Sequence, residues 1–177
     1  MKRFAVVVLA CMAMPVVVHA QEGKSDPIST VLRQTLDENA KNLVATAQEF
    51  PADKYTYHPT PEGMTVGKTM AHIAQVNNFV CSKMSGAAAP SAGAQVQETD
   101  KDKLVANLQA SMDFCKQAFS GLTDAKLTEP MTLFGSRQTS RFAAALEVTN
   151  DLIDHYATLS VYLRLNGLLP PTAQSRQ

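Results

Sequence analysis

Apolar residues recur at helical spacing in four long segments of the chain, and no segment shows a convincing strand pattern. The four predicted helices cover residues 26–50, 65–84, 99–121 and 139–167. Each begins at a residue type that caps helices well, namely Asp26, Thr65, Thr99 or Asp100, and Thr139 or Ser140. Pro27 suits the first helical position, and Gly167 suits a left-handed end to the last helix.

The segments between these helices differ in length and composition. Residues 51–64 form a polar connector, residues 122–138 are irregular, and the tail after Pro170-Pro171 is expected to be loose. Residues 85–99 are small and flexible, and fifteen such residues can cross the roughly 30 Å length of a 20-residue helix. The second and third helices could therefore run parallel.

Four helices in one small domain predict an all-α fold, a four-helix bundle. Cys81 and Cys115 lie about equally far into the second and third helices, so parallel packing would bring them level. Antiparallel packing would separate them beyond the roughly 4.4–6.8 Å between Cα atoms that a disulfide tolerates. In an oxidising compartment the pair indicates a disulfide. The alternative is two buried free thiols.

The first twenty residues resemble a secretory signal peptide. Lys2 and Arg3 precede the apolar stretch 4–18, and Val18-His19-Ala20 is a small-residue cleavage site before Gln21. The stretch is too short for a membrane span, which needs about 20 residues. A lipoprotein with acylated Cys11 is the weaker alternative. We therefore expect an exported domain, residues 21–177, in the periplasm or outside the cell.

The net charge does not favour two classes of partner. Loss of Lys2 and Arg3 leaves fourteen basic residues against sixteen acidic ones, so the exported chain has a net charge of −2. Nucleic acids and anionic membrane surfaces require a basic patch, and neither is expected as a partner.

Candidate chemistry is concentrated in the second and fourth helices. His72 and His155 lie within otherwise apolar helical segments, and Asp151 precedes His155 by four residues, on the same helix face. Burial of an imidazole or a carboxylate is costly unless the group has a hydrogen-bonding or ionic partner, and a divalent metal ion would be such a partner. The alternative is a metal-free hydrogen-bonded cluster. His58, in a proline-rich loop, is expected to be exposed, and Arg164 to be structural.

Several short motifs resemble the DinB family, also known as DinB/YfiT-like metalloenzymes. They are Tyr57–Pro61 with Thr65, Ala71-His72-Ile73, Asp154-His155-Tyr156, Tyr162–Gly167 and Pro170-Pro171. The resemblance implies an up-down-down-up order of helices with a long crossover between the second and third. It also implies a divalent metal held by His72, His155 and the position of Asp151, where the family usually has histidine. Nickel, zinc, iron and manganese all suit such mixed nitrogen and oxygen ligands.

The resemblance also bears on activity. Family relatives include thiol-dependent transferases and isomerases, so the resemblance implies a metalloenzyme that acts on small molecules. Homodimers are common among these relatives, so the resemblance also implies a possible homodimer. Because thiol cofactors are kept mainly in the cytosol, export favours metal-assisted hydrolysis over thiol-dependent transfer. The alternative is a non-catalytic, metal-free or ligand-binding bundle associated with stress. The sequence contains no nucleophile–base arrangement and no phosphate-binding glycine loop.

Overall fold

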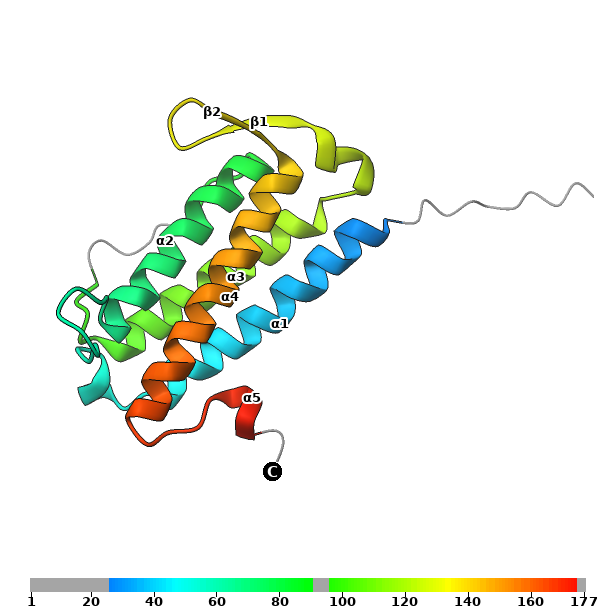
Figure 1. Ribbon diagram of the computed structural model, residues 1–177. Coiled ribbons are helices and arrows are strands. Elements are labelled where there is room, and N and C mark those ends of the chain that lie inside the picture. The colour runs from blue at the N-terminus through cyan, green and yellow to red at the C-terminus, as the bar shows by residue number, and fades with distance from the viewer. Residues whose placement is uncertain (1–25, 91–95, 175–177) are drawn as a thin grey trace, which may run out of the picture.

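The computed structural model describes residues 26–90 and 96–174, which form a mostly helical domain with one small hairpin (Figure 1). The expected signal peptide, residues 1–20, lies outside these residues. The α-helices are α1 (Pro27–Glu49), α2 (Val66–Ser85), α3 (Lys101–Ser120), α4 (Arg141–Leu165) and α5 (Pro171–Gln174). The 3-10 helices are η1 (Ala52–Lys54) and η2 (Asp124–Thr128), and the strands are β1 (Pro130–Leu133) and β2 (Arg137–Ser140). No described helix is long and apolar enough to cross a membrane.

Most of the predicted helix ends are confirmed. The side chains of Thr65, Asp100 and Ser140 each accept a hydrogen bond from the backbone N–H three residues later. Beyond the end of α4, Gly167 has φ +73°, and the next residue donates from its backbone to Leu163. These contacts satisfy backbone groups that the helix ends would otherwise leave without partners.

The cap of α1 differs from the prediction, because the side chain of Asp26 makes no cap hydrogen bond to the helix. Asp124, in η2, instead accepts from the backbone of Ile28 and from both the backbone and the hydroxyl of Ser29. Asp26 accepts in turn from the backbone N–H of Asp124 at 2.7 Å. Desolvation alone would raise the pKa of Asp124, but the bonds from Ser29 and Ile28 hold it below its ordinary value.

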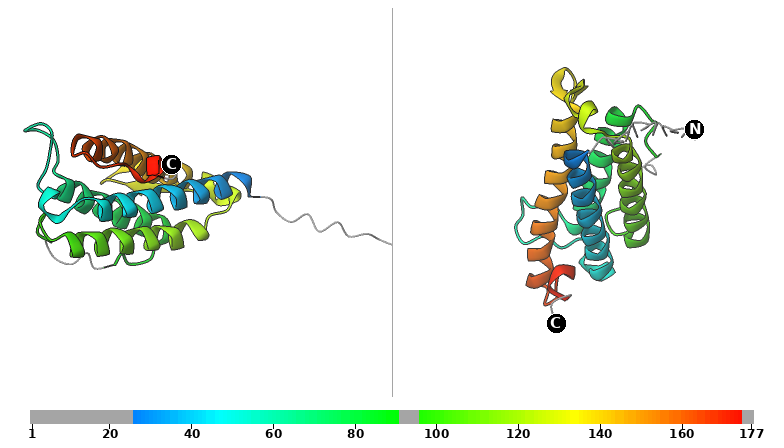
Figure 2. Two further views of the ribbon diagram at one scale, coloured as in Figure 1. Left: turned by 90° about the horizontal axis from the view of Figure 1, so that it is seen from below. Right: turned by 90° about the vertical axis from the view of Figure 1, so that its right-hand side faces the viewer.

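The helices pack in definite relative directions (Figures 1 and 2). Cys81 and Cys115 lie at similar depths in α2 and α3, with Cα atoms 5.3 Å apart, so these two helices run parallel. The ammonium of Lys101, at the start of α3, donates to the backbone oxygen of Phe50, just after α1, so α1 and α3 run in opposite directions. Tyr162, near the end of α4, donates to the backbone oxygen of Met64, just before α2, so α2 and α4 are also opposed.

The crossover between α2 and α3 packs tightly against the start of α2. A Cβ atom on Gly67 would lie 2.1 Å from the backbone oxygen of Glu98, so no larger residue fits there. The carboxylate of Glu98 accepts from the hydroxyl of Thr65 at 2.8 Å. These contacts fix the end of the long connection beside the first turn of α2.

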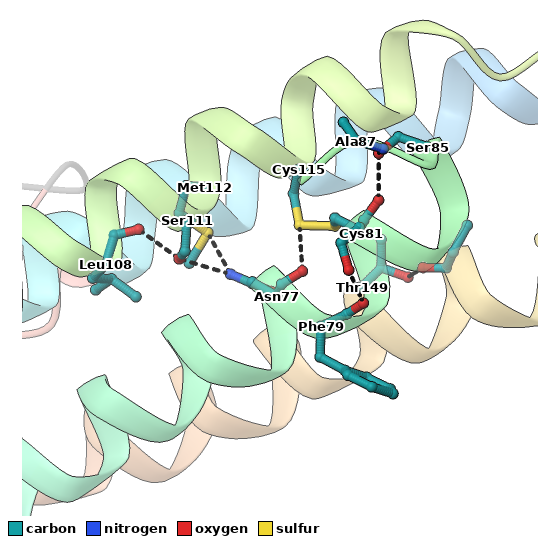
Figure 3. The surroundings of a disulfide bond; sticks show 12 residues. Asn77, Phe79, Cys81, Ser85, Ala87, Leu108, Ser111, Met112, Cys115 and Thr149 are labelled. Carbon is teal, nitrogen blue, oxygen red and sulfur yellow. Dashed lines mark hydrogen bonds between the residues drawn. A yellow bond between two sulfur atoms is a disulfide. The ribbon is translucent and has the colours of Figure 1, made fainter. Parts of the chain in front are cut away.

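A small polar cluster lies between α2 and α3, next to the disulfide that joins Cys81 to Cys115 (Figure 3). The amide nitrogen of Asn77 donates to the hydroxyl of Ser111 at 3.2 Å, and that hydroxyl donates to the backbone oxygen of Leu108 at 2.8 Å. Asn77, Ser111 and both cysteines are fully buried. A covalent bond and neutral hydrogen bonds therefore join the two parallel helices.

The prediction that the chain has no strands is wrong for residues 130–140. β1 and β2 pair antiparallel, with Leu133 opposite Arg137, and the turn between them contains Phe134 at φ +44° and Gly135 at φ +81°. Only Leu133 of the eight strand residues is fully buried, so the segment lacks the alternation that identifies a strand from sequence. The tail predicted to be loose also differs, because it contains the short helix α5.

Candidate metal centre

His72 from α2 and Asp151 and His155 from α4 converge at one point. One potential ligand atom from each residue lies within 4.8 Å of the other two. The two imidazole rings are 5.1 Å apart between centroids and meet edge to face at 74°. Within residues 26–90 and 96–174 this is the one group of three or more such side chains close enough to share an ion.

Burial of the apolar faces of the helices determines where the side chains of these three residues point. Val148, Leu152 and Leu159 are fully buried, which turns the side of α4 that carries Asp151 and His155 towards α2. The spacing of four residues puts that carboxylate and that imidazole one turn apart on the same side. These helices run in opposite directions, and His72, in the second turn of α2, meets α4 near its middle, at Asp151 and His155.

The centre lies at the edge of the bundle, although the apolar segments around His72 and His155 predict that these side chains are buried in the core. His155 is buried, but the side chain of Asp151 is 24% exposed and His72 is partly exposed. A shallow, open depression of about 550 Å³ follows α4, and Asp151 is one of the residues that line it. It is lined by Ala143, Leu146, Glu147, Asn150, Asp151 and Asp154. A small molecule in this depression would be next to the centre.

The contacts of Asp151 fit a metal ligand better than a hydrogen-bonded cluster. Its Oδ1 lies 3.4 Å from Nε2 of His155, longer than a strong N–H···O bond. Its Oδ2 is buried and has no hydrogen-bond partner among the described residues. Two ligand atoms about 2.1 Å from one tetrahedral ion lie roughly 3.4 Å apart. Two imidazoles and a carboxylate are also a common donor set for first-row metals. Asp151 and His155 therefore have the spacing of two ligands of one ion, and His72 completes the donor set within 4.8 Å.

The other polar residues considered from the sequence lie apart from the centre. His58 is exposed, with Nδ1 2.5 Å from the backbone oxygen of Thr60. Arg164 donates to the backbone oxygen of Ser160, in keeping with a structural role. Asp154 is exposed, and the hydroxyl of Tyr156 is 2.7 Å from that of Thr172 in α5.

Sequence reasoning assigned no role to the aromatic and charged residues that lie between the hairpin and the two helices of the centre. Phe134, in the hairpin turn, stacks on Phe79 of α2, with ring centroids 5.0 Å apart. Arg137 of β2 forms an ion pair with Glu147 of α4. The only sequence signals were a Phe-Gly pair and isolated charges, because the pairing depends on a hairpin that the sequence pattern does not reveal.

The family follows from a comparison of the sequence with protein-family profiles. The profile of the DinB superfamily matches residues 35–159, well over half of the chain. The chain belongs to the DinB superfamily. The matched range includes all three residues of the metal centre, and superfamily members often bind metal.

Three solved structures, two of them of DinB-like proteins, have a similar fold. YjoA from Bacillus subtilis is 19% identical, with a TM-score of 0.62, over 77% of this chain and 92% of that one. A DinB-like protein from Bacillus cereus is 16% identical, with a TM-score of 0.64, over 79% and 93%. A conserved protein from Enterococcus faecalis is 16% identical, with a TM-score of 0.57, over 76% and 93%. A comparison with curated proteins gives no match. At these identities the likeness concerns the fold alone.

Proposed function

We propose that this DinB-superfamily protein is an exported enzyme that depends on a divalent metal and acts on a small molecule by hydrolysis or group transfer. One observation carries the proposal. Donor atoms of His72, Asp151 and His155 converge within 4.8 Å, Asp151 also lines an open depression, and its Oδ2 is buried without a hydrogen-bond partner among the described residues. Nickel, zinc, iron and manganese all remain candidates.

We also assign the four long helices to the up-down-down-up order expected from the sequence. The parallel disulfide-linked pair α2 and α3 supports this order, as do the opposed directions of α1 and α3 and of α2 and α4. In this arrangement His72 faces the middle of α4. The metal centre therefore depends on the long crossover between α2 and α3.

A bound divalent ion would supply Lewis acidity and a coordinated water that loses its proton near neutral pH. His72, Asp151 and His155 are the residues that would hold it, and three protein ligands leave positions open for water and substrate. The carboxylate of Asp151 offsets part of the ion's charge. Burial keeps the imidazole of His155 in one orientation, and the depression along α4 gives substrate access from the side of the carboxylate.

Two features support export. The basic start, apolar stretch and small-residue cleavage site of residues 1–20 are those of a secretory signal peptide. A disulfide between Cys81 and Cys115 is a bond that an oxidising compartment would preserve. Amino-terminal sequencing of protein recovered from outside the cytoplasm should begin at Gln21. A mature protein that begins at Met1 and stays in the cytoplasm would contradict export.

Metal titration by calorimetry tests the function. Chelator-treated wild type should bind one equivalent of Zn²⁺, Ni²⁺ or Mn²⁺, and His72→Ala, Asp151→Asn and His155→Ala should each lower the affinity at least 100-fold. His58→Ala and Asp154→Asn are matched controls, because both residues are exposed and lie outside the group of three. Both controls should bind like the wild type.

An activity assay separates the enzyme from the non-catalytic alternative. Metal-loaded wild type should hydrolyse one or more members of a panel of small esters, amides and phosphoesters, and Asp151→Asn should lose that activity. Stoichiometric metal without turnover would favour a binding protein. Absence of metal from the wild type would favour the metal-free bundle and overturn the proposal.

A further inference from the structure

Four apolar residues form one exposed row on the outer side of α4. They are Ile153, Ala157, Val161 and Leu165, each four residues after the one before, and we refer to them as the apolar ridge. Ile153 is 47% exposed, Val161 52% and Leu165 59%. The middle of α4 lies at the outside of the bundle (Figures 1 and 2). The apolar ridge is about 18 Å long, and it faces solvent along its whole length.

The spacing of the apolar ridge is that of a surface which packs against another helix. Residues four apart on a helix form a ridge, and in the commonest mode of helix packing such ridges of two helices fit into each other's grooves. Other exposed apolar residues do not form such a row. Val31 of α1, for example, is 59% exposed, but the next positions on its side of the helix are Thr35 and Glu38.

The exposed residues on this side of α4 are arranged symmetrically along the helix. They lie in pairs at equal distances before and after residue 159, namely Ile153 with Leu165, Asp154 with Arg164, and Ala157 with Val161. Two copies of α4 that run antiparallel about a two-fold axis at this level would place the members of each pair opposite each other. Each apolar residue would then meet an apolar residue, and each carboxylate would meet a guanidinium.

The charges beside the apolar ridge point to a second copy of this chain as the partner. Asp154 and Arg164 are both exposed, and neither has an ion-pair partner within residues 26–90 and 96–174. Arg164 donates to the backbone oxygen of Ser160, which leaves further N–H donors for a carboxylate. The two residues are about 15 Å apart along α4, too far to pair within one copy. An antiparallel pair of copies would join them twice, once on each side of the axis.

We propose that this protein forms a two-fold homodimer in which the apolar ridges of two α4 helices pack antiparallel and Asp154 of each copy pairs with Arg164 of the other. Burial of the two ridges supplies the apolar part of the interface, and the charged pairs fix the relative direction of the helices. Each copy contains its own His72, Asp151 and His155. The dimer therefore does not depend on the proposed metal function.

Sedimentation equilibrium tests the dimer. The wild type should reach twice the monomer mass as its concentration rises. Val161→Glu puts a carboxylate at the centre of the interface and should weaken dimerisation at least 100-fold. Val31→Glu places the same charge at an exposed valine of α1 and should change dimerisation less than two-fold. Both valines are more than half exposed, so both variants should fold, and both should bind metal like the wild type.

Reversal of the charges tests the antiparallel direction. Asp154→Lys and Arg164→Glu should each weaken dimerisation at least ten-fold, because each places like charges opposite one another. The double variant Asp154→Lys/Arg164→Glu restores both attractive pairs, and its dimerisation should return to within three-fold of the wild type. A role of either residue within a single copy would not produce this recovery, because the two side chains do not meet there.

The failure of this inference and the failure of the metal function give different results. A wild type that stays monomeric at all concentrations overturns the dimer, and so does a dimer that Val161→Glu leaves intact. A double charge variant that dimerises no better than either single variant overturns the antiparallel arrangement. A wild type that dimerises as described but binds no metal supports the interface and contradicts the metal function.

Discussion

Polar residues of α2 face both of its neighbours, α3 on one side and α4 on the other, and the two clusters differ in kind. Towards α3, Asn77 donates to Ser111 in a fully buried contact next to the disulfide. Towards α4, His72 meets Asp151 and His155, which are ionisable groups at an edge open to solvent. Each cluster retains one buried oxygen without a partner among the described residues, an amide oxygen in the first and a carboxylate oxygen in the second.

The difference separates a structural contact from a functional one. A neutral amide oxygen without a partner costs a modest amount that the adjacent hydrogen bonds and covalent bond offset. A carboxylate that keeps one buried oxygen without a hydrogen-bond partner among the described residues costs more, and a sequence selected for stability alone would replace it with an apolar residue. We therefore expect changes in the α2–α3 cluster to alter stability, and changes in the α2–α4 cluster to alter metal binding.

The largest expected effect is on the α2–α3 side. The double variant Cys81→Ala/Cys115→Ala should lower the free energy of unfolding by about 3–4 kcal/mol, because the disulfide closes a loop across a sequence separation of 34. Urea denaturation of the oxidised wild type and the variant measures this difference. Metal affinity of the folded variant should stay within two-fold of the wild type. A loss of stability below about 1 kcal/mol would contradict a structural role of this magnitude.

The next effect is on the α2–α4 side. At a metal concentration 100 times the dissociation constant, the wild type should gain about 2.7 kcal/mol of stability, and Asp151→Asn should lose most of that gain. In chelator the same variant should be as stable as the wild type or slightly more stable, because it removes a carboxylate with one buried oxygen that has no hydrogen-bond partner among the described residues. Thermal denaturation with and without metal provides the measurement, with Asp154→Asn as control. Marked destabilisation of metal-free Asp151→Asn would show that the carboxylate stabilises the fold, and would contradict a role in metal binding alone.

A smaller effect is expected for Asn77→Ala. This substitution removes the hydrogen bond to Ser111 and leaves a small cavity between α2 and α3, so the free energy of unfolding should fall by about 2 kcal/mol. Chemical denaturation measures the loss, and calorimetry should find unchanged metal affinity. If metal affinity fell with stability, the two clusters would be coupled, and their division into structural and functional sites would fail.

The smallest effect concerns Asp124, a carboxylate whose hydrogen bonds are satisfied by the start of α1. Its folded-state pKa is lowered, so its contribution to stability is complete above the unfolded-state value and is lost as pH falls through the folded-state value. Asp124→Asn should be less stable than the wild type at pH 7. The difference in free energy of unfolding between the wild type and this variant should become smaller as the pH falls. Equilibrium unfolding measured between pH 7 and pH 2 tests this. A difference that stays constant would exclude the carboxylate charge as its cause.

The sequence predicts the four long helices well, because their apolar positions recur over five or more turns and most caps are local. The cap of α1 could not be found in this way, because Asp124 lies 95 residues from Ser29. The hairpin was missed for a different reason. Its strands are four residues long, and their single fully buried side chain, Leu133, gives no periodic signal.

The residues of the candidate metal centre could also be predicted, because an imidazole and a carboxylate four residues apart must share a helix face. Their position at the edge of the bundle could not, because it depends on the angle at which α2 and α4 meet. The stacking of Phe79 on Phe134 was beyond sequence reasoning for the same reason as the hairpin. Phe79 and Phe134 lie 55 residues apart and meet through the turn at Gly135.

The central claim is that one divalent ion is held jointly by His72, Asp151 and His155. A crystal structure of protein purified without chelator, with diffraction data collected on both sides of the nickel, zinc, iron and manganese absorption edges, tests it most directly. The account predicts a single anomalous peak about 2.0–2.3 Å from one atom of each of the three residues. A peak elsewhere, or hydrogen-bonded side chains without a peak in metal-supplemented crystals, would contradict it.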